Sequence, residues 1–299
     1  DRWNRPLVVP PGGGKPIAYT RCTSFVDCLE DKFNLQQWEL RQCAIGLADR
    51  EDLLLAVSAH RDDKRELNRI VRQAKEAAAA SSKATKGTAL HRLCERADRG
   101  EHIGLLPASA QADLNAYLAA TRSFHYHFIE QFTVHDGLKV GGTPDRVLEW
   151  GGRWRIGDIK TGDIEWGALK IAMQLATYAH STPYRPPGHR EPYPEPVDQE
   201  RAIVIHLPTG QARCELHYVD IAAGWRAVQT AKDVRGWRAR KGWYEPIINP
   251  EPPPAASTLD EQIEAARTVD ELRRLWTEQW TPEQLRRALE RKNQMERAS

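Results

Sequence analysis

The chain has 299 residues, of which 40% are hydrophobic and 28% are charged, and its formal net charge is +2. This apolar content suits a folded core and excludes a disordered chain, and so small a net charge does not by itself indicate a nucleic-acid partner. No apolar run approaches the roughly 20 residues that a membrane-spanning helix needs, and the first residues lack the apolar core of a signal peptide, so we expect a cytoplasmic protein without a membrane partner.

The first part of the chain is predicted to be helical. Residues 1–19 are rich in Pro and Gly and are expected to form an irregular arm. Residues 20–125 show helical spacing of apolar positions, and we expect a helix that opens at Gly87. This helical part belongs to a domain that we expect to span residues 20–248.

Residues 126–248 are predicted to form the sheet core of that domain, because the apolar period changes to alternation at about Tyr126. Three strands are expected in a row, as an antiparallel meander: HFIEQFTVHD, LKVGGTPDRVLEW and RWRIGDIKT. Gly151-Gly152 is the hairpin turn between the last two. A helix should follow from Trp166 to Tyr178, and then a Pro-rich loop over Ser181–Glu200.

Two paired strands, ERAIVIHLP and QARCELHYVD, and a helix from about Ile221 to Lys241 complete the predicted core. Residues 249–256 are a Pro-rich linker. Residues 257–299 are expected to form a helical tail, with cap signals at Thr268 and Thr281. About 40 residues make a small independent unit, so we expect the tail to dock on the main domain or on a protein partner.

Two aspartates and a lysine are expected to converge in the sheet core. Strand residues alternate faces, so Asp158 and Lys160 point the same way, and counting back from the hairpin turn puts Asp145 at the height of Asp158. Neighbouring strands lie ~4.8 Å apart, so both carboxylates can reach one divalent ion. A lysine on the same face can orient water or stabilise charge on a phosphate. These residues indicate metal-assisted phosphodiester hydrolysis.

This arrangement resembles the PD-(D/E)XK nuclease superfamily. Its core motif is matched here by Pro144-Asp145 and by Asp158-Ile159-Lys160. The likeness extends to the RecB-like branch, which includes phage exonucleases and CRISPR-associated RecB-like nucleases. That branch adds G-x-x-x-H followed by Glu on a helix before the sheet, and Q-x-x-x-Y on the helix after the D-x-K strand. Those motifs appear here in family order over about residues 86–180, as Gly87, His91, Glu95, Gln174 and Tyr178.

The resemblance implies a role for each matching residue. The implied metal ligands are His91, Asp145, Asp158 and the backbone carbonyl of Ile159. Lys160 is the implied catalytic lysine, and Gln174 and Tyr178 are implied to contact DNA or to brace the site. A set of imidazole and carboxylate groups suits one or two Mg²⁺ or Mn²⁺ ions, and the nitrogen ligand favours Mn²⁺.

Two glutamates are less clearly placed. Glu95 is either a ligand or a surface partner one helical turn after His91. Glu130 precedes the Asp145 strand. It is either a metal ligand or a residue that contacts a ligand, or else a strand residue that faces solvent.

Two cofactors are not expected. The CRISPR-associated relatives carry an iron–sulfur cluster on one cysteine before the core and three after it, whereas only Cys214 follows the core here, so no cluster is expected. The five cysteines show no C-x-x-C spacing. The chain also lacks a Walker A motif, so no ATP is expected.

The predicted helix from Ile221 carries a basic second half with interleaved tryptophans. Its members are Lys232, Arg235, Trp237, Arg238, Arg240 and Lys241. Cations and stacking surfaces suit single strands or frayed duplex ends. A solvated helix face with Trp in the core explains the pattern equally well.

We therefore expect an α+β, restriction-endonuclease-like core, in which helices flank a central mixed sheet. The expected function is divalent-metal-dependent cleavage of DNA by an exonuclease, in phage or bacterial recombination and repair. If the protein is phage-encoded, the cytoplasm is that of the bacterial host. The alternatives are a non-catalytic protein that binds DNA ends or a partner through a vestigial site, and a hydrolase of a smaller phosphate ester.

Overall fold

The computed structural model describes residues 1–78, 82–246, 257–276 and 279–298. The chain divides into two compact units, Asp1–Arg240 and Lys241–Ser299. The predicted linker, residues 249–256, lies outside the described residues. Among the described residues, no helix combines the length and the apolar character needed to cross a bilayer.

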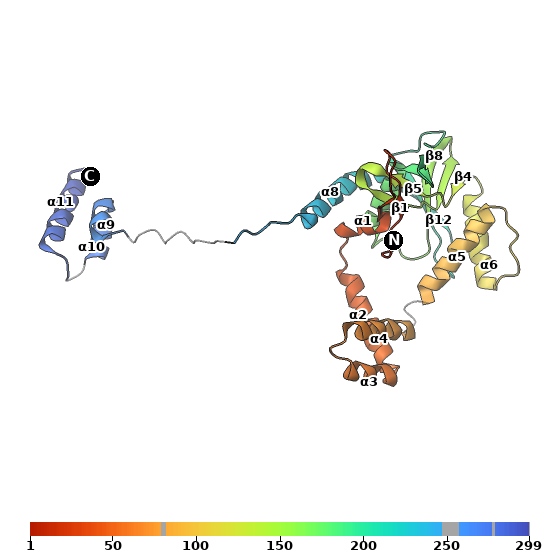
Figure 1. The fold of residues 1–299 in the computed structure, drawn as a ribbon, viewed down its shortest axis with the longest axis horizontal. Coiled ribbons are helices and arrows are strands. Elements are labelled where there is room, and N and C mark those ends of the chain that lie inside the picture. The colour runs from red at the N-terminus through yellow and green to blue at the C-terminus, as the bar shows by residue number, and fades with distance from the viewer. Residues whose placement is uncertain (79–81, 247–256, 277–278, 299) are drawn as a thin grey trace. The chain divides into compact units, whose positions relative to one another are not determined.

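The elements follow the chain as helices, then strands, then helices (Figure 1). The helices are α1 (Cys22–Val26), α2 (Phe33–Ala48), α3 (Glu51–Ala59), α4 (Lys64–Ala77), α5 (Ser82–Asp98), α6 (Ala108–Thr121), α7 (Ala168–Ala179), α8 (Ile221–Ala239), α9 (Leu259–Ala265), α10 (Val269–Leu275) and α11 (Pro282–Ala298), with 3₁₀ turns η1 (Asp27–Leu29) and η2 (Asp136–Leu138). The strands are β1 (Leu7–Val8), β2 (Ile17–Ala18), β3 (Thr20–Arg21), β4 (His125–Ile129), β5 (Thr133–His135), β6 (Val140–Gly142), β7 (Arg146–Trp150), β8 (Arg153–Lys160), β9 (Thr182–Arg185), β10 (His189–Arg190), β11 (Arg201–His206) and β12 (Glu215–Asp220).

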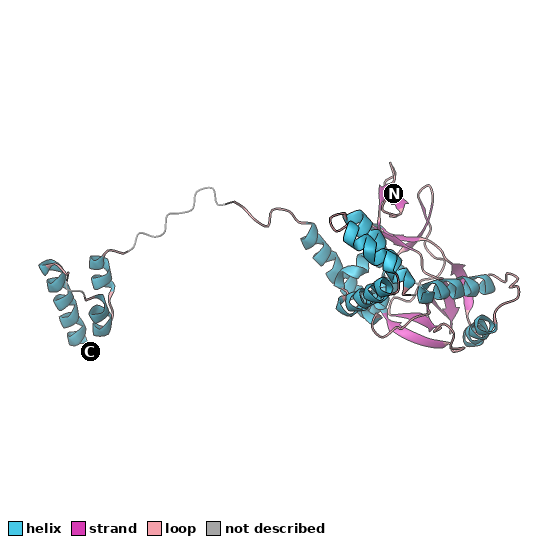
Figure 2. Ribbon diagram, turned by 90° about the horizontal axis from the view of Figure 1, so that it is seen from below, coloured by secondary structure: helices cyan, strands magenta, loops and turns pink. Residues whose placement is uncertain are grey.

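The central sheet has five strands in the order β12-β11-β8-β7-β4. It is mixed, because β11 runs parallel to β8 while the other neighbours are antiparallel. Alternating residues face opposite sides: Ile156 packs with α7 and α8, whereas Ile159 packs with α5 and α6. Helices therefore cover the sheet, as Figure 2 shows. The predicted restriction-endonuclease-like core is confirmed.

Two predicted strands are each divided between two sheets. The stretch from His125 to His135 forms β4 in the central sheet and β5 in a second one, whose order is β10-β9-β5-β6-β3. The next stretch forms β6 in the second sheet and β7 in the central sheet. The breaks have local causes: Glu130 adopts a left-handed conformation with φ 54°, and Pro144 has no N–H to donate to a ladder. The expected meander is therefore β4–β7–β8 rather than three uninterrupted strands.

Three further expectations are corrected. The arm predicted to be irregular contains the antiparallel pair β1–β2. The Pro-rich loop contains β9 and β10, which pair as a hairpin. Gly87 does not open its helix, because α5 begins earlier, at Ser82.

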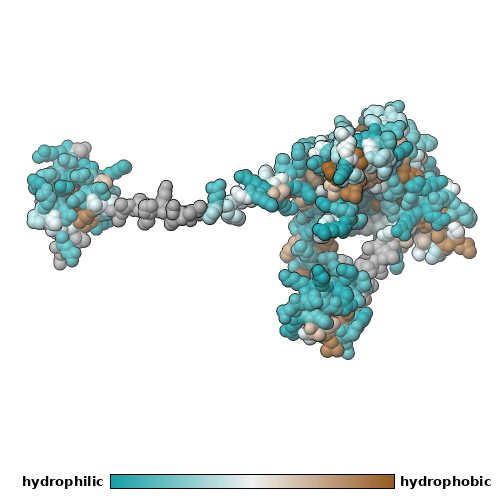
Figure 3. Space-filling model, in the orientation of Figure 1, coloured by the Kyte–Doolittle hydropathy of each residue, from teal (hydrophilic) through white to brown (hydrophobic). Residues whose placement is uncertain are grey.

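Helices α2, α3 and α4 form a lobe with its own small apolar cluster. Leu53, Ile70 and Ala74 are its buried residues. Leu54 and Leu55 on α3 are exposed, and Figure 3 shows a hydrophobic area at the α3 end of this lobe.

The second unit has a core of Ile263, Ala266, Leu272 and Trp280. Both predicted caps are present: the Thr268 side chain accepts a hydrogen bond from the Glu271 N–H, and Thr281 and Gln284 exchange bonds between side chain and backbone.

Candidate active site

The hairpin β7–β8 sets the positions of the two predicted aspartates along the paired strands. Gly151 and Gly152 have φ of 60° and 70°, the left-handed conformations that a tight two-residue turn requires. The ladder from this turn ends at the pair Arg146↔Gly157. One step further, Asp145 stands opposite Asp158. Lys160 lies on the same face as Asp158, and its Nζ is 2.6 Å from Asp158 Oδ2.

Asp145 is fixed from two sides. Its Oδ2 accepts a hydrogen bond of 2.7 Å from the Ile159 N–H, and His91 Nε2 lies 2.7 Å from the same oxygen. The N–H and C=O groups of one strand residue point to the same side, so the Ile159 carbonyl faces the space beside Asp145. His91 reaches this point because α5 approaches the turn after β8 closely at Gly87, where a Cβ would collide with the Thr161 side chain.

Glu130 lies near His91 and Asp145. One ligand atom from each of His91, Glu130 and Asp145 lies within 4.8 Å of the others. The Glu130 N–H donates a hydrogen bond of 3.0 Å to the Asp145 carbonyl, so the left-handed break between β4 and β5 aims this side chain at the site. Glu130 is therefore not a solvent-facing strand residue, which was one of the two expectations from the sequence.

The charges at this point are crowded. Burial, followed by the nearby Asp145, raises the pKa of Asp158 to about 6. The same two causes raise the pKa of Glu130 to about 7. Hydrogen bonding to Asp145 raises the pKa of His91. Burial lowers the pKa of Lys160, but the carboxylates of Asp158 and Asp145 together raise it, and the net shift is upward. Buried carboxylates that repel one another are relieved by a bound cation, so the donor set fits a hard divalent metal ion.

Residues 55–185 match the family model of the PD-(D/E)XK nuclease superfamily. The matched segment contains the convergent residues His91, Glu130, Asp145, Asp158 and Lys160. PD-(D/E)XK nucleases use divalent metals, and the donor set described above is of a kind that can hold such an ion. No curated protein matches the chain.

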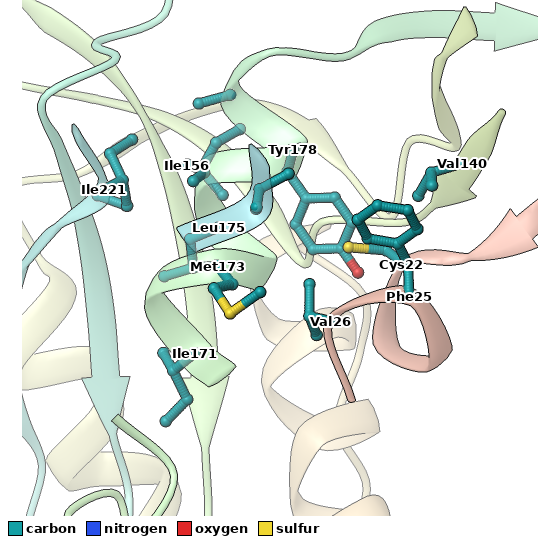
Figure 4. Close-up of a cluster of buried hydrophobic side chains, with 14 of the residues drawn as sticks. Cys22, Phe25, Val26, Val140, Ile156, Ile171, Met173, Leu175, Tyr178 and Ile221 are labelled. Carbon is teal, nitrogen blue, oxygen red and sulfur yellow. The ribbon is translucent and has the colours of Figure 1, made fainter. Parts of the chain in front are cut away.

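Gln174 and Tyr178, the predicted Q-x-x-x-Y pair, lie against the turn before Asp145. Gln174 Nε2 donates a hydrogen bond of 3.2 Å to the Tyr178 hydroxyl. The Tyr178 ring lies beside Cys22 and Phe25 of α1 (Figure 4) and closes over Gly142, where a Cβ would stand 2.7 Å from a ring carbon. Tyr178 is almost fully buried, which favours bracing over DNA contact for this residue.

Arg146, which the sequence analysis did not select, holds the backbone of the metal site. Its side chain is fully buried, and Nη1 donates a hydrogen bond of 2.7 Å to the Asp145 carbonyl. Its Nε donates a bond of 2.7 Å to Asp98, which also accepts one of 2.6 Å from the Tyr117 hydroxyl. No motif spacing connects these three residues, and the only signal is a charged residue at the start of a buried strand.

Glu95 lies on α5 one turn after His91 and pairs with Arg99, with Oε1 2.9 Å from Nη2. It is not one of the three residues that share ligand distance. This placement favours the surface-partner alternative.

The predicted DNA-binding residues on α8 and after it are mostly exposed, namely Lys232, Trp237, Arg238, Arg240 and Lys241. Arg235 instead packs on α1, where its guanidinium lies 5.1 Å from the centre of the Phe25 ring. Trp225 stacks on His180 with ring centroids 3.9 Å apart and so belongs to the packed side of the helix. The exposed set remains open to both alternatives.

Proposed function

We propose that this chain is a divalent-metal-dependent deoxyribonuclease of the RecB-like type, which removes nucleotides from DNA ends in phage or bacterial recombination and repair. The observation that carries the proposal is the convergence of His91, Glu130 and Asp145 on one point, beside the buried pair of Asp158 and Lys160.

The proposed ligands come from four places in the fold. They are His91 on α5, Glu130 at the β4–β5 break, Asp145 before β7, and Asp158 with the Ile159 carbonyl on β8. A bound Mg²⁺ or Mn²⁺ ion polarises the scissile phosphate and lowers the pKa of water. Asp145 has one oxygen held by the Ile159 N–H, which fixes the direction of the other.

Lys160 is proposed to position the attacking water and to stabilise charge on the phosphate. Its pKa is raised, so the side chain stays an ammonium ion at neutral pH and acts through charge rather than as a base. Asp158 holds that ammonium ion in place at 2.6 Å. Gln174 and Tyr178 keep the turn before Asp145 in position.

The test is digestion of end-labelled linear DNA and of closed circular DNA by the full chain with Mn²⁺, with Mg²⁺ and with EDTA. We expect release of nucleotides from linear DNA with either metal, an intact circle, and no cleavage in EDTA. Cleavage of the circle would change the proposal to an endonuclease. No cleavage of either substrate, by a chain that still binds DNA, would leave the non-catalytic DNA-end-binding alternative.

The catalytic variant is Lys160→Ala. Its matched control is Lys64→Ala, at an exposed lysine on the lobe of α2, α3 and α4. Equal rates for Lys160→Ala and the unaltered chain would exclude the proposed catalytic centre, even if some nuclease activity were present.

A further inference from the structure

A second group of metal-ligand side chains lies on the other half of the central sheet. His206 ends β11, and Glu215 and His217 lie on β12. One ligand atom of each lies within 4.8 Å of the others. The sheet register explains this, because His206 pairs directly with Glu215, and His217 is two residues further along the same face.

His206 is oriented as metal-bound histidines are. Its Nε2 lies 3.0 Å from the Gly162 carbonyl oxygen. A carbonyl only accepts hydrogen bonds, so Nε2 carries the proton and Nδ1 keeps a free lone pair. Metal-bound histidines characteristically donate their other N–H to a carbonyl or carboxylate, which fixes the ring.

Glu215 is held in the same manner. Arg213 Nη1 lies 2.9 Å from Glu215 Oε1, so this arginine fixes one oxygen of the carboxylate. The other oxygen, Oε2, is 3.5 Å from His217 Nε2. The ring centroids of His206 and His217 are 6.1 Å apart. The second carboxylate oxygen of Glu215 and the two imidazoles thus face one small space.

We propose that His206, Glu215 and His217 form a second metal site that binds a zinc-class transition-metal ion. Two imidazoles and one carboxylate, with a fourth position open to water, are a zinc ligand set, whereas Mg²⁺ prefers oxygen ligands. The site shares no residue with the group of His91, Glu130 and Asp145, and Asp145 precedes β7, which lies two strands from β11, roughly 10 Å at the usual strand spacing.

The position of His206 indicates a structural role for the bound ion. His206 pairs in register with Lys160 on β8, and its bond to Gly162 holds the turn that follows that lysine. A metal ion on His206 fixes the edge β11–β12 and, through one imidazole, the loop after the proposed catalytic strand.

The test is calorimetric titration of the full chain with Zn²⁺ alone, comparing His217→Ala with His125→Ala. Both histidines are exposed strand residues of the central sheet, on its two opposite edge strands, so neither change is expected to unfold the protein. We expect His217→Ala to bind one Zn²⁺ ion fewer than the unaltered chain, and His125→Ala to bind the same number. Equal stoichiometry and affinity for His217→Ala would overturn the proposal.

A second variant separates this site from the nuclease centre. Asp145→Asn should keep the Zn²⁺ ion that His217→Ala loses, together with the visible absorption that Co²⁺ shows in a four-coordinate site. Loss of all Zn²⁺ binding in Asp145→Asn would assign the bound metal to the nuclease centre alone and overturn the second site. Circular dichroism of each variant confirms that the fold is retained.

Discussion

Asp158 is the residue at which the proposed activity and folding stability oppose each other. Its carboxyl group is buried, and burial together with Asp145 raises its pKa to about 6. A raised pKa means that the folded chain holds the proton more tightly than the unfolded chain does, so ionisation of Asp158 at pH 7 weakens folding.

The variant Asp158→Asn is therefore expected to lose DNA cleavage by about 10³-fold or more, since several kcal/mol of charge stabilisation are removed and each 1.36 kcal/mol is tenfold in rate. Its Tm reports two opposing effects: loss of a charge buried beside Asp145 stabilises the chain, and loss of the partner of the Lys160 ammonium destabilises it. Glu165→Gln, at an exposed carboxylate, is the control and should change neither quantity. Wild-type cleavage by Asp158→Asn would contradict the proposed role of this carboxylate.

The stability of the metal-free protein should depend on pH through three residues of the same site. Glu130 has its pKa raised to about 7 by burial and by Asp145, Asp158 has its pKa raised to about 6, and the pKa of His91 is raised by Asp145. Raised pKa values in the folded state mean that stability falls as the pH rises, through a window from about 4 to about 7 for the two carboxyl groups and above 6.5 for His91.

We expect the Tm in EDTA to decrease across this window, and the decrease to be smaller in Glu130→Gln. Addition of Mn²⁺ should raise the Tm most at the upper end of the window, because a metal ion binds the deprotonated carboxylates. A Tm that rises from pH 5 to pH 7 in EDTA, in both proteins, would show that these groups do not govern the dependence.

At the scale of the element, the turn between β6 and β7 depends on the absence of a side chain. A Cβ on Gly142 would lie 2.7 Å from the Tyr178 ring and 2.9 Å from Cys22 Cβ, closer than packed atoms approach. Gly142→Ala should therefore lower stability by about 1–3 kcal/mol, the usual cost of overpacking, and reduce cleavage by displacing Asp145. Urea denaturation and the linear-DNA assay measure the two effects.

Gly236→Ala is the matched control on a helix. A Cβ there meets no atom within 4 Å, and Gly236 lies inside α8, so the change should stabilise the chain by about 0.5–1 kcal/mol. If Gly142→Ala instead stabilised the chain, as Gly236→Ala is expected to do, the Tyr178 ring would not exclude a side chain at position 142.

The same turn shows which parts of the fold could be predicted from the sequence. The register of β7 and β8 could be predicted, because the Gly151-Gly152 turn sets which residues stand opposite each other. The division of strands between two sheets could not be predicted, because apolar alternation continues through Glu130. The break depends on the left-handed backbone conformation of that one residue. For the same reason the sequence alone leaves Glu130 open between a place in the candidate site and a strand position that faces solvent. The bonds from Arg146 to Asp98 and to the Asp145 carbonyl join segments of unrelated spacing, so only the tertiary structure reveals them.

At the scale of the whole molecule, the two units have separate cores. Trp280 is buried in the second unit with Ile263, Ala266 and Leu272, and its Nε1 donates a hydrogen bond of 2.9 Å to the Leu275 carbonyl. Removing a buried Trp side chain costs about 3–5 kcal/mol, which approaches the entire stability of so small a unit. Trp280→Ala should therefore unfold the tail alone.

The measurements are limited proteolysis, which should cut the Trp280→Ala chain after residue 256 and leave the first unit intact, and cleavage of a short linear duplex. We expect cleavage within about twofold of the unaltered chain, because the proposed catalytic residues all lie in the first unit, between His91 and Tyr178. Trp276→Ala, at a side chain that is 55% exposed, should leave the tail resistant to protease. Loss of cleavage in Trp280→Ala, with the first unit still folded, would mean that the tail takes part in catalysis, whereas weaker retention of longer DNA or of a protein partner would assign it to binding.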